Sequence, residues 1–433
     1  MQNVARKTIR MVMKIARTVA LLLAVGAVTS ALAAVKPVAV WCGDFPTSND
    51  GTDTRGGYTL SMNGNAASAD GSIVTISSSA TRGVTVMRAT STTPSAVVVG
   101  VSDIPSTKTK TVFLSRRTDS YDDIDHLALD TSKQIKFIMD NHNDKHTSNQ
   151  IFGDGVHYVG ISYDTSLSSG TSYYYDKTSL GAINWQWAAR KMFGYTLGGC
   201  YNSASGHFDT YNADGATFNY VAVIESSAAT DIQNWSPTNM TSTCSPATGT
   251  TLSSTDNATL ASQGINLPTD GSITISGDVK VAALFAQGAS EIRFADENSS
   301  LTVSGPVYVA DSNTLTITPA ALSASGTKTL ITASVIGSAS NLSVTPPTES
   351  GYTYTASVGD TAVTLTRKPA PSKTYSAAIG SWTASGWGNF AGGTSVEKVR
   401  VGPNASASTV FEISSGFCPY VGFQAPSSSS WSF

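Results

Sequence analysis

The sequence predicts an all-β protein, with a β-sandwich in its first half and a region of very short strands in its second. Only 13% of the residues are charged, where about 25% is usual, and Ser, Thr, Gly and Ala fill the difference. After residue 35 no amphipathic helical run is found, and short apolar stretches are separated by Gly, Asn, Asp and Ser turns. A chain of 433 residues is long enough for about two or three domains, each with its own core.

The N-terminus predicts export. A basic segment is followed by an apolar run at residues 19–28 and by the small-residue sequence Ala31-Leu32-Ala33. This order is that of a secretory signal peptide, so we expect residues 1–33 to be removed. The alternative is a membrane anchor, but an apolar run of about ten to fifteen residues is too short to span a bilayer. We therefore expect a secreted or cell-surface protein with no transmembrane segment after signal cleavage.

The most specific pattern in the chain lies at residues 151–176. In an extended segment, Val159, Ile161 and Tyr163 point to one side, which makes one face of this stretch apolar. A Ser- and Gly-rich turn at residues 165–171 separates this stretch from a second β-rich run at residues 173–176. Two such runs joined by a polar loop predict an antiparallel hairpin.

This hairpin resembles the centre of laminin-G-like and concanavalin A-like jelly rolls, through Gly155, His157, Val159, Ile161, Tyr163 and Asp164, then Tyr173, Tyr175 and Asp176. The family usually has Gly after the last Asp. This chain has Lys177 there, which predicts a looser turn. In the same family a closing strand precedes a short helix containing Asp-Ile, and residues 218–224 and 228–235 fit those two places. The resemblance implies that residues 35–236 form one jelly-roll β-sandwich.

Earlier strands of this sandwich are expected from the same alternation of apolar and polar residues. They lie at residues 38–45, 56–62, 71–77, 83–88, 97–99, 111–114, 127–129, 135–139 and 188–197. Residues 130–133 separate two of these strands and predict a hairpin turn. Residues 141–146, which contain two histidines, are expected to form a polar loop.

The second half of the chain changes character. Residues 237–256 are rich in Ser, Thr and Pro and predict a linker. Residues 257–368 contain apolar pairs spaced by two, each in a strand of four or five residues: Ile273/Ile275, Ile292/Phe294, Leu301/Val303, Val307/Val309, Leu315/Ile317, Leu342/Val344 and Val363/Leu365. Short strands in series predict a stacked β-solenoid, similar in texture to autotransporter-type passenger repeats, and a small second β-sandwich is the alternative. Residues 369–433 form a Gly/Ser/Trp-rich C-terminal segment.

The four cysteines leave several pairings open. Cys42, Cys200, Cys244 and Cys418 are too widely spaced for a zinc site. Export would place them in an oxidising compartment, where disulfides are allowed. A Cys42–Cys244 bridge would join the two ends of the jelly roll, which should lie close together. Other pairings, and four free thiols, are the alternatives.

A Ca²⁺ site is the one cofactor site that the sequence suggests. The densest acidic region contains Asp119, Asp122, Asp123, Asp140 and Asp144. Jelly rolls of the resembled type often carry Ca²⁺ on a rim of the sandwich, bound by carboxylate and amide oxygens. The spacing is not that of an EF-hand loop, and solvated turns between strands are the alternative. No other cofactor is expected.

Carbohydrate and protein are the expected partners. Tyr174, Trp185, Trp187 and Tyr201 belong to an aromatic-rich stretch that would offer flat faces to sugar rings, although such residues also commonly build a sandwich core. A net charge of −3 without a basic block argues against nucleic acid.

The acidic residues argue against catalysis. Glycosidases of concanavalin-like fold need two carboxyl groups at one glycosidic bond, and Glu225 is the single Glu within residues 35–236. The sequence therefore predicts a protein that is not an enzyme and that binds carbohydrate or an extracellular protein through the jelly roll. A structural stalk without a specific ligand is one alternative. A glycoside hydrolase or other polysaccharide-active enzyme is the other, because fold analogy is a weak guide to function.

Overall fold

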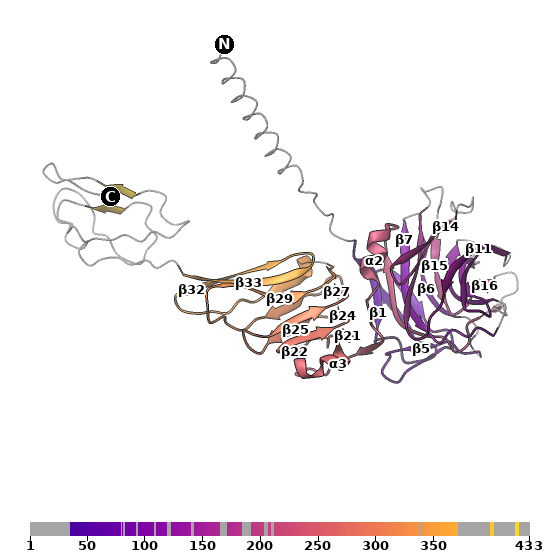
Figure 1. Cartoon of the computed structure of the whole chain (residues 1–433), viewed down its shortest axis with the longest axis horizontal. Coiled ribbons are helices and arrows are strands. Elements are labelled where there is room, and N and C mark those ends of the chain that lie inside the picture. The colour runs from indigo at the N-terminus through magenta and orange to yellow at the C-terminus, as the bar shows by residue number, and fades with distance from the viewer. Residues whose placement is uncertain are drawn as a thin grey trace, which may run out of the picture.

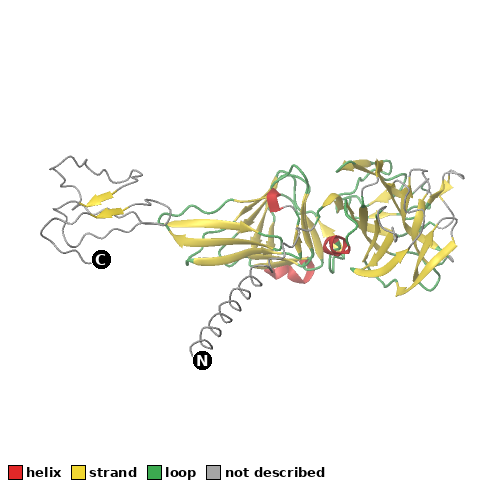
Figure 2. Ribbon diagram, turned by 90° about the horizontal axis from the view of Figure 1, so that it is seen from above, coloured by secondary structure: helices red, strands yellow, loops and turns green. Residues whose placement is uncertain are grey.

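The computed structural model describes residues 35–78, 80, 83–91, 94–107, 110–118, 123–139, 143–164, 171–183, 192–202, 207–208, 212–337, 339–370, 399–401 and 421–423. Two regions lie side by side in it, a β-sandwich and a β-solenoid that extends away from the sandwich (Figure 1). Strands account for almost all of both regions, and the few helices are short (Figure 2). The predicted fold class, an all-β protein with a sandwich followed by a solenoid, is therefore confirmed.

Two eight-stranded antiparallel sheets form the sandwich. The first sheet contains, in order, β14 (Thr178–Ile183), β13 (Thr171–Tyr175), β12 (His157–Tyr163), β7 (Ser95–Ser102), β18 (Thr217–Ile224), β5 (Val74–Thr75) and β4 (Ala66–Ala67), with β1 (Pro37–Cys42) also paired to β18. The second contains β11 (Asn143–Ile151), β10 (Gln134–Met139), β9 (Asp123–Leu129), β8 (Thr111–Thr118), β15 (Met192–Leu197), β6 (Val84–Ser91), β3 (Tyr58–Ser61) and β2 (Thr52–Arg55). A small separate sheet pairs β16 (Tyr201–Asn202) with β17 (His207–Phe208).

The predicted central hairpin is confirmed as β12 and β13, which pair antiparallel with Ile161 opposite Tyr173. Val159, Ile161 and Tyr163 are at most 1% exposed and lie in the core between the two sheets. The opposite face of β12 is buried as well: helix α2 (Ala229–Trp235) approaches it at Gly160, and Met240 covers Tyr158. A Cβ atom at Gly160 would lie 3.3 Å from Ile232 Cγ2, so the glycine allows the helix to approach the strand closely.

The turn after β13 is tighter than expected. Asp176 and Lys177 connect β13 to β14 with φ angles of 43° and 69°, which are left-handed conformations that favour Gly or Asn. Two contacts hold the turn: the Asp176 amide donates to the Tyr158 carbonyl oxygen (2.8 Å), and Gln233 Nε2 donates to the Lys177 carbonyl oxygen (2.8 Å). A Lys in this conformation costs about 1–2 kcal/mol relative to the right-handed region.

A second correction concerns the residues that were expected to form a polar loop near His146. Residues 143–151 form strand β11, which pairs antiparallel with β10. β11 lies at the edge of the second sheet and has one neighbouring strand. Because an edge strand needs no continuous apolar face, its polar sequence does not show the alternation by which strands are recognised.

Three faces of five strands each make up the solenoid. The first contains β19 (Ser242–Cys244), β21 (Gln263–Asn266), β24 (Ala283–Ala286), β27 (Pro306–Val309) and β30 (Val335–Ile336), and we call it the docking face. The second contains β20 (Thr251–Ser253), β22 (Gly271–Ser276), β25 (Ser290–Phe294), β28 (Leu315–Thr318) and β31 (Leu342–Val344). The third contains β23 (Asp278–Val281), β26 (Ser300–Val303), β29 (Gly326–Thr332), β33 (Ala362–Pro369) and β32 (Tyr352–Val358).

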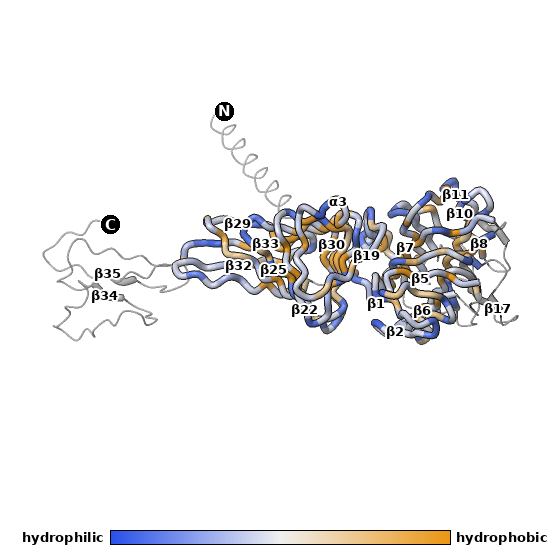
Figure 3. Tube along the Cα trace, turned by 90° about the horizontal axis from the view of Figure 1, so that it is seen from below, coloured by the Kyte–Doolittle hydropathy of each residue, from blue (hydrophilic) through white to orange (hydrophobic). Residues whose placement is uncertain are grey.

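Neighbouring strands of the solenoid are parallel, except that β29, β33 and β32 pair antiparallel at the end of the third face. The interior is built from columns of apolar residues in register, such as Ile273, Ile292 and Ile317. Figure 3 shows hydrophobic stretches along these strands and along those of the sandwich. The pairs of apolar residues spaced by two therefore point into the solenoid, as the sequence predicts.

The segment expected to be a linker is part of the solenoid. Within residues 237–256, β19 and β20 pair in parallel with β21 and β22, and a short 3₁₀ helix, η2 (Ser254–Asp256), precedes α3 (Asn257–Leu260). The sequence hides these strands because each has three residues and a single strongly apolar one, Cys244 or Leu252. A second 3₁₀ helix, η3 (Ala339–Asn341), lies before β31. Further along the chain the structure describes β34 (Val399–Val401) and β35 (Val421–Phe423), which pair in parallel.

Two other expectations concern a disulfide between Cys42 and Cys244 and the presence of a transmembrane helix. Cys42 and Cys244 are free thiols, so the bridge between the ends of the jelly roll is not formed. Cys200 is buried, and Cys418 lies outside the described residues. Across the described ranges, the helices are too short and insufficiently hydrophobic to cross a bilayer.

Candidate functional site

The sandwich and the solenoid are joined by an apolar contact between the outer face of the first sheet and the docking face. This contact buries residues of both regions together: Val40, Ala96, Val98, Tyr158, Tyr220, Ile232 and Trp235 on the sandwich side, and Met240, Ala283, Phe285, Tyr308 and Val335 on the solenoid side. Tyr220 packs on Phe285 with ring centroids 5.8 Å apart, and Trp235 meets the ring of Tyr308 edge-on at 6.0 Å. We call this contact the junction.

Polar contacts and one close approach fix the junction further. Tyr158 donates its hydroxyl to the Met240 carbonyl oxygen (2.7 Å), and Gln287 Nε2 donates to the Val40 carbonyl oxygen (3.1 Å). A Cβ atom at Gly337 would lie 2.3 Å from the Trp235 ring, so only Gly fits at this position of the solenoid. The surfaces of the two regions are therefore complementary in shape and in hydrogen bonding.

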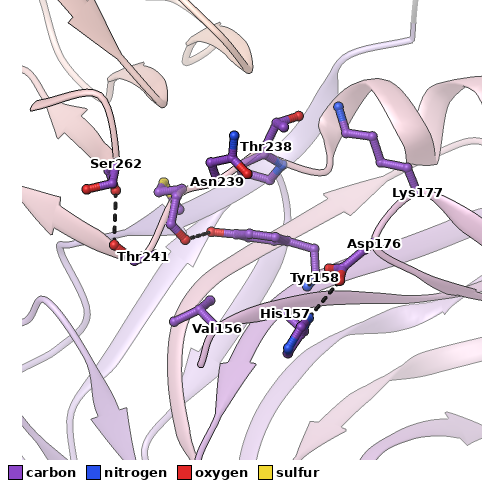
Figure 4. Close-up of a pocket in the computed structure, with 11 residues that line it drawn as sticks. Val156, His157, Tyr158, Asp176, Lys177, Thr238, Asn239, Thr241 and Ser262 are labelled. Atoms are coloured by element: carbon purple, nitrogen blue, oxygen red, sulfur yellow. Dashed lines mark hydrogen bonds and ion pairs between the residues drawn. The ribbon is translucent and has the colours of Figure 1, made fainter. Parts of the chain in front are cut away.

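A pocket of about 480 Å³ opens beside the junction, with walls from both regions (Figure 4). The sandwich supplies the start of β12 and the turn after β13, and the solenoid supplies the segment before β19 and the turn after α3. The lining residues are Val156, His157, Tyr158, Asp176, Lys177, Pro237, Thr238, Asn239, Met240, Thr241 and Ser262. Figure 4 shows Asn239, Thr238 and Lys177 in the upper part of the view, and Val156 and His157 below Tyr158.

One wall of the pocket is held by a His–Asp pair. His157 Nδ1 lies 2.6 Å from Asp176 Oδ2, and the second carboxylate oxygen of Asp176 accepts the Tyr158 amide (2.9 Å). The imidazole ring also stacks on Tyr175 with centroids 4.9 Å apart. Both oxygens of Asp176 are therefore engaged, and His157 bonds within the fold, as expected from its place in the hairpin.

Burial shifts the pKa values of two other groups in the pocket, Tyr158 and Lys177. Burial raises the pKa of Tyr158 well above its ordinary value, so its hydroxyl stays neutral and can donate to Met240. Burial lowers the pKa of Lys177. No acidic side chain of the described residues contributes to this shift. The pocket thus combines an apolar floor, several hydrogen-bonding groups, a carboxylate paired with His157, and a lysine that forms no ion pair with the described residues.

The residues that the sequence suggested as ligands lie elsewhere. The Tyr174 side chain is 4% exposed and belongs to the buried cluster at the junction. For Tyr201, Asp123 and Asp144 the structure describes the strands β16, β9 and β11 but not the side chains. Trp185, Trp187, Asp119, Asp122 and Asp140 lie outside the described residues. The aromatic platform and the Ca²⁺ site therefore stay predictions.

The pocket itself was not predicted. Its solenoid wall, Pro237 to Thr241 and Ser262, lies in the segment expected to be a linker and just after it. One signal was present in β12, where Tyr158, Gly160 and Ser162 occupy the side that a solvent-facing strand would fill with charged residues. That signal indicates that something covers the strand, but it does not identify the solenoid.

Comparison with known proteins gives no family. No protein-family model and no curated protein sequence matches the chain. A Trypanosoma rangeli sialidase in complex with 2,3-difluoro-KDN matches at 11% identity with a TM-score of 0.35, over 46% of this chain and 32% of that one. The heptameric SAP-like pentraxin from Limulus polyphemus matches at 8% identity (TM-score 0.30; 37% of this chain, 79% of that one). The binding domain of botulinum neurotoxin serotype D matches at 10% identity (TM-score 0.31; 46% and 50%).

These comparisons correct one prediction. The sequence predicts that the protein is not an enzyme, and this prediction is contradicted because sialidases are among the structures that match. The chain spans about a third of the length of the sialidase chains, 32% in the first case. At these identities and TM-scores the matches assign neither a reaction nor a ligand to this protein.

Proposed function

We propose that this protein binds carbohydrate at the cell surface or outside the cell, and that the ligand occupies the pocket at the junction. The observation that carries the proposal is the combination of a pocket of about 480 Å³ with an apolar floor and a polar rim. Its volume is in the range of small-molecule sites, which are mostly apolar with a few placed polar groups. Sugar rings have apolar faces and hydroxyl edges, so both parts of the pocket would be used.

Two features support an extracellular role. Residues 1–33 have the order of a secretory signal peptide, and residues 35–236 have the hairpin and the closing strand-helix pattern of laminin-G-like jelly rolls. We therefore also propose that residues 35–236 form a laminin-G-like domain. The proposal concerns binding, and a hydrolysis assay with the bound carbohydrate is the test of any catalytic step.

A second binding surface remains part of the proposal. Trp185, Trp187 and Tyr201 would offer a stacking platform, and Asp119, Asp122, Asp123, Asp140 and Asp144 would hold Ca²⁺ on the rim. Since Tyr174 is buried, the platform depends on the other three aromatic residues. If chelation of Ca²⁺ abolishes binding, the ligand binds at the rim. If binding survives chelation but is lost when a bulky substitution fills the pocket, the ligand binds at the junction.

A structural role is the second candidate function, favoured by the solenoid itself. Its parallel strands stack in register on three faces, and its docking face packs firmly on the sandwich. Such a body could hold the sandwich at a distance from a surface. In that case the sandwich would bind no carbohydrate, and a glycan array would detect none.

A glycan array probed with the intact secreted chain tests the proposal. The variant Thr238→Trp places an indole in the pocket, and Thr348→Trp, an exposed loop position of the solenoid, is the matched control. We expect wild type and Thr348→Trp to bind the same glycans, and Thr238→Trp to lose at least tenfold in affinity while keeping its melting temperature. Binding that Thr238→Trp leaves unchanged would contradict the junction pocket as the site.

A further inference from the structure

We infer that the ligand of the junction pocket is an anionic carbohydrate whose acidic group binds the Lys177 ammonium. This inference rests on the proposed function, since it names the class of sugar that the pocket takes. It rests on a difference between Asp176 and Lys177, the two charged residues of the turn that lines the pocket: Asp176 has partners among the described residues, and the Lys177 ammonium forms no ion pair with them.

The first of these charges is satisfied within the protein. Asp176 has one oxygen 2.6 Å from His157 Nδ1 and accepts the Tyr158 amide with the other. Each oxygen of this carboxylate therefore has a partner within the hairpin, and an ionised carboxylate has no hydrogen to donate to a ligand. Asp176 therefore serves to hold the turn against β12.

The second charge is not satisfied. Lys177 lines the same pocket, is partly buried, and has no carboxylate partner in the part of the chain that the structure describes. A partly desolvated ammonium without a counter-charge is unfavourable, and an anionic ligand group would relieve this cost. A neutral sugar would give it hydrogen bonds but no counter-charge.

The backbone at Lys177 also favours a binding role. Its φ of 69° is a conformation that Gly or Asn adopts with less strain, and the Lys177 carbonyl oxygen is held by Gln233 Nε2 (2.8 Å). The fold thus keeps a strained lysine at a rigid turn on the pocket wall. Strained residues that the surrounding structure holds in place are concentrated at binding sites.

The acidic group can be a carboxylate, as in uronic acids, or a sulfate ester. Lysine is a compact point charge with three donors and does not require the two-pronged geometry that arginine favours, so it suits either anion. Both kinds of sugar are therefore included as arms of one experiment.

The experiment is isothermal titration of the intact secreted chain with three probes: trigalacturonic acid, its methyl ester, and N-acetylglucosamine 6-sulfate. The methyl ester keeps the ring and hydroxyl groups of the acid and removes its charge. The variants are Lys177→Gln, which removes the cation, and Lys177→Arg, which keeps it. Lys280→Gln, an exposed lysine on β23, is the control for net charge.

We expect wild type, Lys177→Arg and Lys280→Gln to bind at least one anionic probe, and Lys177→Gln to bind it about tenfold to a hundredfold more weakly. If the uronate is that probe, its methyl ester should bind wild type as weakly as the acid binds Lys177→Gln. If the sulfated sugar is that probe, the anion is a sulfate ester and the inference also holds.

Two results separate the inference from the proposed function. Equal affinity of wild type for trigalacturonic acid and its ester, or unchanged binding of the acidic probes by Lys177→Gln, overturns the inference and leaves carbohydrate binding standing. The same holds if the glycan array yields only neutral sugars. If neither the array nor the titrations detect any carbohydrate bound to wild type, both the proposed function and the inference fail.

Discussion

The sandwich and the solenoid are both built from β-strands, but their strands find partners at very different distances along the chain. In the sandwich, β1 pairs with β18, so that Val40 lies opposite Ala222. In the solenoid, each parallel strand pairs with the equivalent strand of the next turn, as Ile273 does with Ile292. The sandwich therefore closes as one cooperative unit, whereas the solenoid is stabilised turn by turn by its nearest neighbours.

The pocket lies where these two kinds of structure meet. Its sandwich wall is a hairpin within a cooperative sheet, and its solenoid wall is the segment leading into the first strand of the docking face. A mutation at the junction should therefore affect binding without unfolding either region, whereas a mutation in either core should act on that region's stability.

The largest effect is expected from opening the solenoid interior with Ile292→Ala. Ile292 is fully buried between Ile273 and Ile317, and the cavity should cost about 2–5 kcal/mol of unfolding free energy. Hydrogen exchange should become faster in the turns around β25 and stay unchanged in the sandwich. Ile161→Ala is the matched change in the sandwich core and should speed exchange throughout both of its sheets. Equal acceleration in both regions by Ile292→Ala would mean that the solenoid is not stabilised locally.

The next effect is expected at the junction, from Gly337→Ala. The added methyl group would collide with the Trp235 ring at 2.3 Å, so the two regions must separate or shift, at a cost of about 1–3 kcal/mol. Carbohydrate affinity should fall with little change in the exchange of either core. Gly359→Ala is the control, since its methyl group would have one neighbour, the Ala362 carbonyl oxygen at 3.6 Å. A Gly337→Ala variant that melts and binds like Gly359→Ala would refute the close packing of the junction.

A smaller effect, of opposite sign, is expected from Lys177→Gly. Glycine adopts a φ of 69° without strain, and the gain should exceed its greater loss of chain entropy by about 0.5–1 kcal/mol. The variant should therefore melt slightly higher than wild type while losing its preference for acidic sugars. A lower melting temperature would show instead that the Lys177 side chain stabilises the turn.

The smallest effect is expected from acid on the far end of the solenoid. Arg367 Nε and Nη2 donate to the Glu349 carboxylate at 2.9 and 2.6 Å, Tyr354 donates its hydroxyl at 2.7 Å, and these bonds hold the pKa of Glu349 below its ordinary value of 4.5. The unfolded chain then binds more protons than the folded one, so this contribution is present above pH 4.5 and is lost as the pH falls below it. Melting curves of wild type and Glu349→Gln should differ at pH 6 and converge towards pH 3. Curves that stay parallel over this interval would assign the acid sensitivity to other groups.

Much of the fold could be predicted because burial leaves a pattern in the sequence. The β12–β13 hairpin and the interior pairs of the solenoid are predicted from apolar residues at every second position, whereas α2 is implied by the resemblance to laminin-G-like jelly rolls. These patterns exist because each strand has one side facing a core. The strands that were missed, β11 and β19 among them, lie at sheet edges or have too few residues to alternate.

The candidate site could not be predicted in the same way. His157 and Asp176 lie within one hairpin, so their proximity follows from local pairing. Asn239 and Thr241 reach the same pocket because two regions dock, and no local pattern records that contact. The prediction of a loose turn at Lys177 was wrong because the turn's conformation is imposed by contacts with Tyr158 and Gln233 and not by its own preference.

The most direct test of a shared binding site is hydrogen exchange of the purified chain with and without a saturating carbohydrate ligand found on the array. We expect protection on both walls of the pocket together, in peptides covering residues 153–178 and 237–243. Protection confined to one of these two segments, or appearing at residues 184–208 instead, would contradict a binding site formed jointly by the sandwich and the solenoid.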